Sequence, residues 1–463
     1  MLGECTSDLA MNRIEVPSSV DTMIRGSLMR RGWPRAFGAF GVLDTLLAVL
    51  LASLALVAAD APAPASSKAA KAAKADVPAN VHRRSPLPNV VILAADGWAD
   101  SDLGTNGAFP NLEKLAASGL RWSQAYAGAA STPASRAALL TGRHSGHGPI
   151  RGPVPGPLAN EDVTFGEVFR SAGYRTAVIG VWDLGGNNTP GHPMKQGFSD
   201  WFGFLDSREA KNLYPKALWR NTDVFDNLID QRGRLANYAP DWFARFATNY
   251  IQVHEDHPFF LYVAHPLPGG VVSEDVRGRH RLQWDTLVGA VVRELEQSRI
   301  RRETLLVVTS ISGTASGEDR LTEAQLRVPL LFSWPGKITA GQTNERPVAL
   351  WDVLPTVAAL ARIPAPQGLD GISLLPEVLG GLKEPTIRAG GLYWETAEAP
   401  PSRAIRWDHW KAVERSSAGA VELYDLKADP AAAQNVAAHQ PERVAEARRR
   451  LREAADPLSP HRP

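Results

Sequence analysis

Runs of consecutive apolar residues alternate along the chain with segments in which apolar residues recur every three or four positions. Four of the apolar runs have the length of a strand and end in turn residues: 88–96, 174–182, 258–265 and 303–310. A strand that is apolar on both faces belongs inside a parallel sheet, so we expect four buried parallel strands. Helical spacing begins after Pro110, at Val163 and at Trp284.

Strands that alternate with amphipathic helices predict an α/β fold, with a mostly parallel sheet covered by helices on both faces. Ligands bind such sheets beyond the carboxyl ends of the strands. Candidate chemistry is therefore expected just after four residues: Leu93, Gly180, Ala264 and Thr309. After about Gly380 the apolar segments become shorter, which predicts a small antiparallel sheet, and a charged terminal helix follows at 441–455.

The first 59 residues indicate a signal region. An apolar run at 45–59 follows Arg30, Arg31 and Arg35, and it is shorter than the ~20 residues that a membrane span needs. We expect export to the periplasm or the extracellular space, with translation starting at Met23 or Met29. An uncleaved N-terminal anchor is the alternative.

The rest of the chain divides by composition. Residues 60–87 are rich in Ala, Pro and Lys, which predicts a linker. We expect the main α/β domain at 88–380 and a C-terminal subdomain at 381–463.

Charge and cysteine content narrow the possible partners. The 463 residues include 50 Lys and Arg against 49 Asp and Glu, so the formal charge is +1. No overall field favours nucleic acid or an anionic membrane, and we expect no nucleic-acid partner and no membrane span in the mature chain. The single cysteine, Cys5, lies in the signal region, so the exported chain would offer no thiol to a metal or a nucleophilic site.

The segment STPASRAALLTGRHSGHGPIRG, residues 131–152, resembles the signature region of the sulfatase family. Other segments match the family in the same order and together cover 88–435, among them PNVVILAADGWADSDLG, GYRTAVIGVWDLG and WDVLPTVAALARIPAP. The resemblance implies an alkaline-phosphatase-like α/β fold and hydrolysis of sulfate esters. It also implies a formylglycine made from Cys or Ser, a calcium ion and basic side chains that hold the sulfate.

The calcium ligands that the resemblance implies are mostly missing. The family's Asp-Asp pair after the first strand appears here as Ala95 and Asp96, and its later Asp and Asn appear as Ile311 and Ser312. Calcium needs about six oxygen ligands, several of them anionic, so Asp96 alone is too little to hold the ion. We expect no cofactor, and calcium only if the protein is active. Three other acids could compensate for the loss: Asp100, Asp102 and Asp319.

The nucleophile position is altered as well. Counting back from Arg136 along the family motif places Thr132 at the nucleophile, and Ser131 fits only with one inserted residue. Threonine is not a known formylglycine precursor in the family. Thr132 could attack phosphorus if a metal ion activated it, as in phosphodiesterases of the same superfamily. The other interpretation is that Ser131 and Thr132 cap the following helix.

The positions that hold sulfate in the family have also changed. The family's Lys and His after the next strand appear as Val181 and Asp183, and Asp183 would repel sulfate. Its Pro-His pair falls on residues 268–269, with His265 as a possible substitute, and its late lysine falls near Glu318. Arg136 and Arg327 remain from this set.

These changes favour a degenerate sulfatase homologue, a pseudoenzyme that binds a sulfated or anionic small molecule, a glycan or a partner protein. The alternative is an active sulfate- or phosphate-ester hydrolase that uses Thr132 or Ser131 with a metal site rebuilt around Asp96 and Asp183. A third possibility is a structural scaffold. His144 and His147 are expected to shape the loop after the signature helix.

Overall fold

The computed structural model describes residues 87–103, 109–226, 238–267, 274–313, 321–380, 388–396, 401–415 and 419–456. The expected signal region and almost all of the expected linker lie outside these residues. So do several positions named above: Cys5, Met23, Met29, Gly269, Glu318 and Asp319. Within the described part of the chain, no helix combines the length and the apolar character that crossing a membrane requires.

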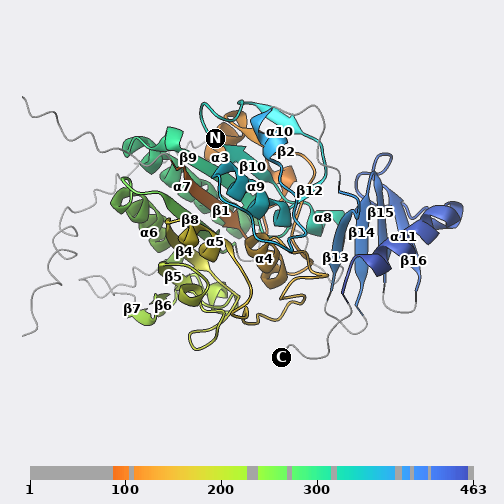
Figure 1. Ribbon diagram of the computed structural model, residues 1–463, viewed down its shortest axis with the longest axis horizontal. Coiled ribbons are helices and arrows are strands. Elements are labelled where there is room, and N and C mark those ends of the chain that lie inside the picture. Colours follow the sequence, from red (N-terminus) through yellow and green to blue (C-terminus); the bar gives the residue numbers. More distant parts are fainter. Residues whose placement is uncertain are drawn as a thin grey trace, which may run out of the picture. The chain divides into compact units, whose positions relative to one another are not determined.

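A ten-stranded sheet forms the centre of the fold, in the order β11-β2-β10-β9-β1-β8-β4-β5-β6-β7 (Figure 1). Its five middle strands run parallel: β9 (Thr304–Ser310), β1 (Asn89–Ala95), β8 (Phe259–His265), β4 (Arg175–Val181) and β5 (Asp200–Phe204). Four flanking strands add antiparallel pairs: β2 (Leu120–Trp122), β6 (Ala217–Arg220), β7 (Asp223–Asp226) and β10 (Leu330–Ser333). The edge strand β11 (Gln342–Asn344) pairs with β2 in parallel. The four strands predicted from apolar runs are β1, β4, β8 and β9, and the mostly parallel sheet is confirmed.

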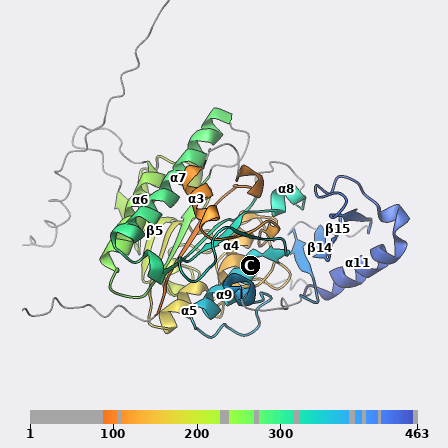
Figure 2. The same cartoon turned by 90° about the horizontal axis from the view of Figure 1, so that it is seen from above.

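Helices cover both faces of this sheet, as predicted (Figure 2). Alternate residues of β1 point to opposite faces, so Val90 and Ile92 join one core and Val91 and Leu93 join the other. The first core is completed by three helices: α4 (Thr132–Thr141), α5 (Phe165–Ser171) and α9 (Val353–Leu360). The second is completed by α3 (Pro110–Ala117), α6 (Ala239–Val253) and α7 (Glu274–Gln297). Smaller elements complete this part of the chain: β3 (Ala125–Tyr126), β12 (Val348–Ala349), α8 (Glu323–Leu326) and α10 (Leu375–Leu379).

A four-stranded antiparallel sheet follows, also as predicted. Its strands are β13 (Leu392–Glu395), β14 (Arg403–Trp407), β15 (Trp410–Glu414) and β16 (Val421–Asp425), and helix α11 (Pro441–Glu453) buries Ala447 and Leu451 in their core. Buried polar contacts join this sheet to the larger part. Trp394 Nε1 donates to Ala127 O at 2.9 Å, and Lys411 Nζ lies 2.8 Å from Glu323 Oε1. Because these groups are buried, the contacts fix the sheet against the α/β part.

Two facing glycines let β4 approach both of its neighbours closely. Gly180 has φ +111°, and a Cβ atom there would lie 1.9 Å from Ala264 O of β8. Gly203 pairs with Gly180 in register, and its Cβ atom would lie 1.8 Å from Gly180 O. No side chain fits at either position without moving a backbone. Asp183 follows β4 directly, so this close packing also sets where its carboxylate emerges.

We expect Gly180→Ala to lower the free energy of unfolding by more than about 2 kcal/mol, because the added methyl group forces β4 away from β8. Urea denaturation measures the change. Gly186→Ala is the matched control, since a Cβ atom there meets no heavy atom within 4 Å. The control is expected to stay within about 0.5 kcal/mol of the wild type. If both variants lost the same free energy of unfolding, the close approach of β4 to β8 would not contribute to stability.

Candidate functional site

Three charged side chains meet at the carboxyl edge of the central sheet. Asp96 follows β1 directly, Asp183 follows β4 by two residues, and Arg136 lies in the second turn of α4. Helix α4 has Pro133 at its second position, where a missing N–H costs nothing, and it ends at Gly142 with φ +69°. This helix directs Arg136 into the protein, where the side chain is 0% exposed.

The guanidinium of Arg136 bridges the two carboxylates. Its Nη2 donates to both oxygens of Asp96, at 3.0 and 3.1 Å, and its Nη1 donates to Asp183 Oδ2 at 2.5 Å. Asp183 is 0% exposed and Asp96 is 15% exposed at the side chain. The formal charge of the three groups together is −1, and the cation binds both acids through its two terminal nitrogens.

Burial and mutual attraction set the protonation of this cluster. Burial raises the pKa of Asp96 to about 6, an effect that Arg136 opposes and Asp183 reinforces. Burial by itself lowers the pKa of Arg136, but Asp96 and Asp183 together raise it above its usual value. Tyr262 of β8 lies beside Arg136, and burial raises the pKa of its phenol to about 12. The guanidinium therefore stays charged at any pH at which the protein is folded.

Asp183 is held from both sides. The amide N–H groups of Trp182 and Asp183 donate to Phe204 O and Leu205 O, which carries the β4–β5 pairing beyond the strand ends. Asp183 has φ +65°, and its Oδ1 accepts from Ser207 N at 2.6 Å. The sequence alone predicted that Asp183 repels sulfate or joins a rebuilt metal site, and it did not predict the pairing of Asp183 with Arg136. The opposite charges of Arg136 and Asp183 were the sequence signal for this pair, since both residues belong to segments that end near the carboxyl edge of the sheet.

The two hydroxyls considered as nucleophiles lie at the start of α4. Ser131 is the N-cap residue, but its Oγ donates to Gly152 O at 2.7 Å and makes no capping bond to the helix. Thr132 is the first residue of the helix and is half-buried. The capping interpretation thus holds for the position of Ser131 and not for its hydroxyl. Thr132 is one helical turn from Arg136, so both side chains lie on the same face of the helix.

The residues at the family's metal positions do not form a calcium site. Ile311 is buried and apolar, and its N–H donates to Ala95 O. Ser310 Oγ accepts from Trp98 N, and its one hydrogen is shared between Ser312 O at 2.7 Å and Ala95 O at 3.0 Å, so all three oxygens already have hydrogen-bond partners. Both oxygens of Asp96 bind the guanidinium. Among the described residues at these positions, a cation that needs about six oxygen ligands does not find them.

Two of the three acids proposed as replacements, Asp100 and Asp102, lie in the described part of the chain and have partners of their own. Arg121 binds Asp100 through three contacts of 2.8 to 3.2 Å. Asp102 accepts from Ala99 N and pairs with Arg281 at 3.1 Å. Neither carboxylate is free to complete a metal site beside Asp96.

His265 and Arg327, the other expected binding residues, make no direct side-chain bond to the three-charge cluster within the described residues. The His265 ring is buried against Trp284, with ring centroids 5.4 Å apart, while its backbone O accepts from Asp96 N. Arg327 follows α8, and its Nη2 donates to Ser123 O. It lines a polar cavity of about 240 Å³. Five other polar residues share the lining: Ser123, Gln124, Tyr126, Glu323 and Glu345.

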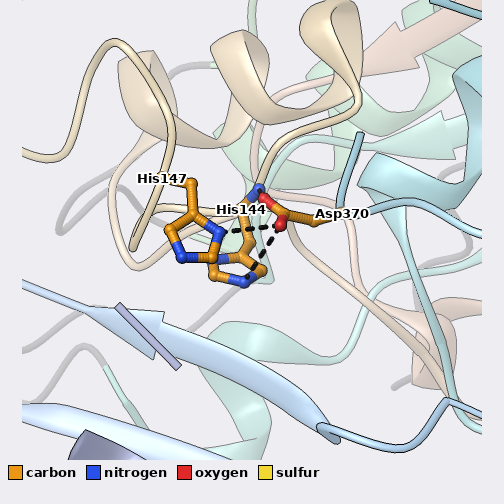
Figure 3. Close-up of side chains that lie close together, drawn as sticks. All are labelled: His144, His147 and Asp370. Atoms are coloured by element: carbon orange, nitrogen blue, oxygen red, sulfur yellow. Dashed lines mark hydrogen bonds and ion pairs between the residues drawn. The ribbon is translucent and has the colours of Figure 1, made fainter. Parts of the chain in front are cut away.

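His144, His147 and Asp370 have the composition of a metal site (Figure 3). His147 Nδ1 lies 2.7 Å from Asp370 Oδ1, and the same oxygen is 3.6 Å from His144 Nε2. His144 Nδ1 accepts from Gly146 N, and burial lowers the pKa of this imidazole to about 4. A neutral ring with that bond carries its proton on Nε2, so no lone pair of His144 faces Asp370.

The cluster instead ties the loop after α4 to a distant segment. Asp370 Oδ2 accepts from His144 N at 2.9 Å, and the N–H groups of Asp370 and Gly371 donate to Gly142 O. The structural role expected for His144 and His147 agrees with these bonds.

Two family models match this chain. The model "Sulfatase" matches residues 88–267 and 274–363, and the model "N-sulphoglucosamine sulphohydrolase, C-terminal" matches residues 319–457. Arylsulfatase A from Homo sapiens is 31% identical over 415 residues, which cover 76% of this chain and 80% of the relative.

Solved structures are similar in fold. A protein in complex with k-i-k-neocarrahexaose has a TM-score of 0.67 and 24% identity, over 79% of this chain and 92% of that protein. A protein in complex with its substrate D-glucosamine-2-N,6-O-disulfate has a TM-score of 0.66 and 20% identity, over 79% of this chain and 97% of that protein.

The buried imidazole of His265 predicts a loss of stability in acid. Burial, and then the charge of His280, lowers the pKa of His265 from its ordinary 6.5 to about 3. The unfolded chain therefore takes up a proton below about pH 6.5 that the folded chain refuses, so this contribution is complete above that pH and is lost as the pH falls. Going from pH 7 to pH 5 should remove about 2 kcal/mol of the free energy of unfolding through this group.

Urea denaturation at the two pH values, compared with His265→Phe, measures the effect. The variant keeps a ring against Trp284 but has nothing to titrate, so its stability should fall less between pH 7 and pH 5. An identical fall in both proteins would contradict the assignment.

Proposed function

This chain belongs to the sulfatase family, and from that premise we propose that it binds a sulfated or otherwise anionic saccharide without hydrolysing it. The observation that carries the proposal is the closed arrangement of Arg136 between Asp96 and Asp183. Hydrolysis of a sulfate ester requires cations that stabilise the charge of the transferred group in the transition state. Of the two cations that remain at the positions that the family resemblance assigns to this task, Arg136 is already paired with two carboxylates.

The saccharide part of the proposal comes from the relatives. One structural neighbour was solved with k-i-k-neocarrahexaose, and another with D-glucosamine-2-N,6-O-disulfate as its substrate. Arg327 is the candidate residue for the anionic group, because its guanidinium lines the polar cavity of about 240 Å³. Glu345, which is exposed at the same cavity, would accept hydrogen bonds from sugar hydroxyls.

Export forms part of the proposal. The basic residues followed by an apolar run at 45–59 support a signal segment. A protein outside the cytoplasm would meet polysaccharides of the kind proposed as ligand. The alternative function is ester hydrolysis by Thr132 or Ser131, which lie at the start of α4, one turn before Arg136.

We expect the purified protein to release no more product from 4-nitrophenyl sulfate, or from an aryl phosphate diester, than its Thr132→Ala variant. The reason is that Arg136 cannot serve the ester while it bridges two acids. Spectrophotometric assays with added calcium or zinc measure this, and mass spectrometry of the peptide that contains Ser131 shows whether formylglycine is made. Turnover that depends on metal and disappears in Thr132→Ala would establish the hydrolase instead.

Binding of a sulfated oligosaccharide should depend on Arg327. Arg327→Gln is expected to weaken binding about tenfold, since a charge-assisted hydrogen bond is worth about 1.5 to 3 kcal/mol. Isothermal titration calorimetry with a sulfated oligosaccharide and its desulfated form measures the change. Arg121→Gln, which removes a cation paired with Asp100, is the control and should leave affinity unchanged. If neither oligosaccharide binds, the proposal is wrong, and the result supports the interpretation of the protein as a structural scaffold.

A further inference from the structure

The pairing of Arg136 with Asp96 and Asp183 also bears on whether this site holds a metal ion. We propose that the guanidinium of Arg136 is the resident cation of this site and takes the place of the divalent ion that the family resemblance implies. The protein would then need no metal to fold or to keep this edge of the sheet in order. The inference depends on the geometry of the cluster and holds whether or not the proposed ligand is bound.

The first argument is how the carboxylate oxygens are used. Asp96 gives both of its oxygens to Nη2 of Arg136, at 3.0 and 3.1 Å. Asp183 gives Oδ2 to Nη1 and Oδ1 to the N–H of Ser207. A metal ion would have to displace the guanidinium from both acids, and Arg136 is 0% exposed with no other described acid bound to it.

The second argument is the charge. The two carboxylates supply −2 and Arg136 supplies +1, so a divalent ion beside them would raise the total to +1 and would lie close to a fixed cation. Like charges repel strongly where the effective dielectric constant is low. Ile311 and Ser312 stand where the family has an Asp and an Asn, so neither of these two positions supplies a negative charge that would offset this repulsion.

The third argument is that the guanidinium performs the structural task of a bridging ion. It joins the end of β1 to the end of β4, two strands that are separated in the sheet by β8. A planar group with five donors can bind two carboxylates at once, whereas an ammonium would bridge them poorly. Unlike a metal ion, this cation is covalently part of α4, so it also fixes the helix to the sheet.

The proposal is tested first on the unchanged protein. After dialysis against calcium and then against metal-free buffer, elemental analysis should find far less than one calcium or zinc per chain. The Tm should be the same in a chelator, in metal-free buffer and in millimolar calcium. Stoichiometric metal, or a Tm that drops on chelation and returns with calcium, would overturn the proposal.

A second test replaces the cation. Arg136→Gly leaves two facing buried carboxylates and space for a guanidinium ion, and the Tm should fall by roughly 5–10 °C, since losing one partner of a buried ion pair is costly. Low millimolar guanidinium chloride should restore part of this loss, while equal potassium chloride should not. Arg121→Gly, which removes a partly exposed partner of Asp100, is the matched control and should show no such recovery.

If Arg136→Gly does not fold, Arg136→Lys takes its place, because a lysine keeps the charge and loses the fork. Its Tm should fall below that of the wild type and should rise on addition of guanidinium no more than the control does. A lysine variant with the Tm of the wild type would show that the bridging geometry of the guanidinium does not contribute to stability. A glycine variant rescued by calcium and not by guanidinium would show a metal site instead.

Discussion

The buried carboxylate of Asp183 and the mostly buried carboxylate of Asp96 can lie at the ends of β4 and β1 because a guanidinium lies between them. Burying one ion is strongly unfavourable, and breaking a buried pair leaves an uncompensated charge that costs about 3–5 kcal/mol. Arg136 supplies the compensating positive charge to Asp96 and to Asp183 at the same time. The position of α4 and the path of the chain after β4 both follow from it.

The constraint also explains why neighbouring features are so tightly specified. Gly180 and Gly203 allow β4 to lie against β8 and β5, which places Asp183 within reach of a helix that covers the sheet. The N–H of Ser207 holds the oxygen of Asp183 that the guanidinium does not use. A displacement of either strand would separate the charges, so packing and electrostatics depend on each other at this edge.

The sequence predicted the fold well because apolar patterning is a local property. The strands β1, β4, β8 and β9 are buried on both faces and appear as uninterrupted apolar runs, and the family resemblance supplied their arrangement. The site was harder, because it depends on contacts between distant residues. Asp183 is 47 residues from Arg136, and the two meet only when helix α4 packs over the sheet edge at which β4 ends. Judged alone, Asp183 looked like a repulsive acid, whereas its partner makes it a structural one.

The same reasoning separates acids that are free to bind from acids that are not. Asp96 and Asp183 bind Arg136, Asp100 binds Arg121, and Asp370 binds two histidines of the loop after α4. Each has the residue type of a metal ligand, and in each the oxygens already accept bonds from the protein. Residue type alone therefore predicts a ligand poorly, and the partner of each oxygen decides. The cavity beside Arg327 is the better candidate for a ligand, because the half-buried Arg327 lines it together with the exposed residue Glu345.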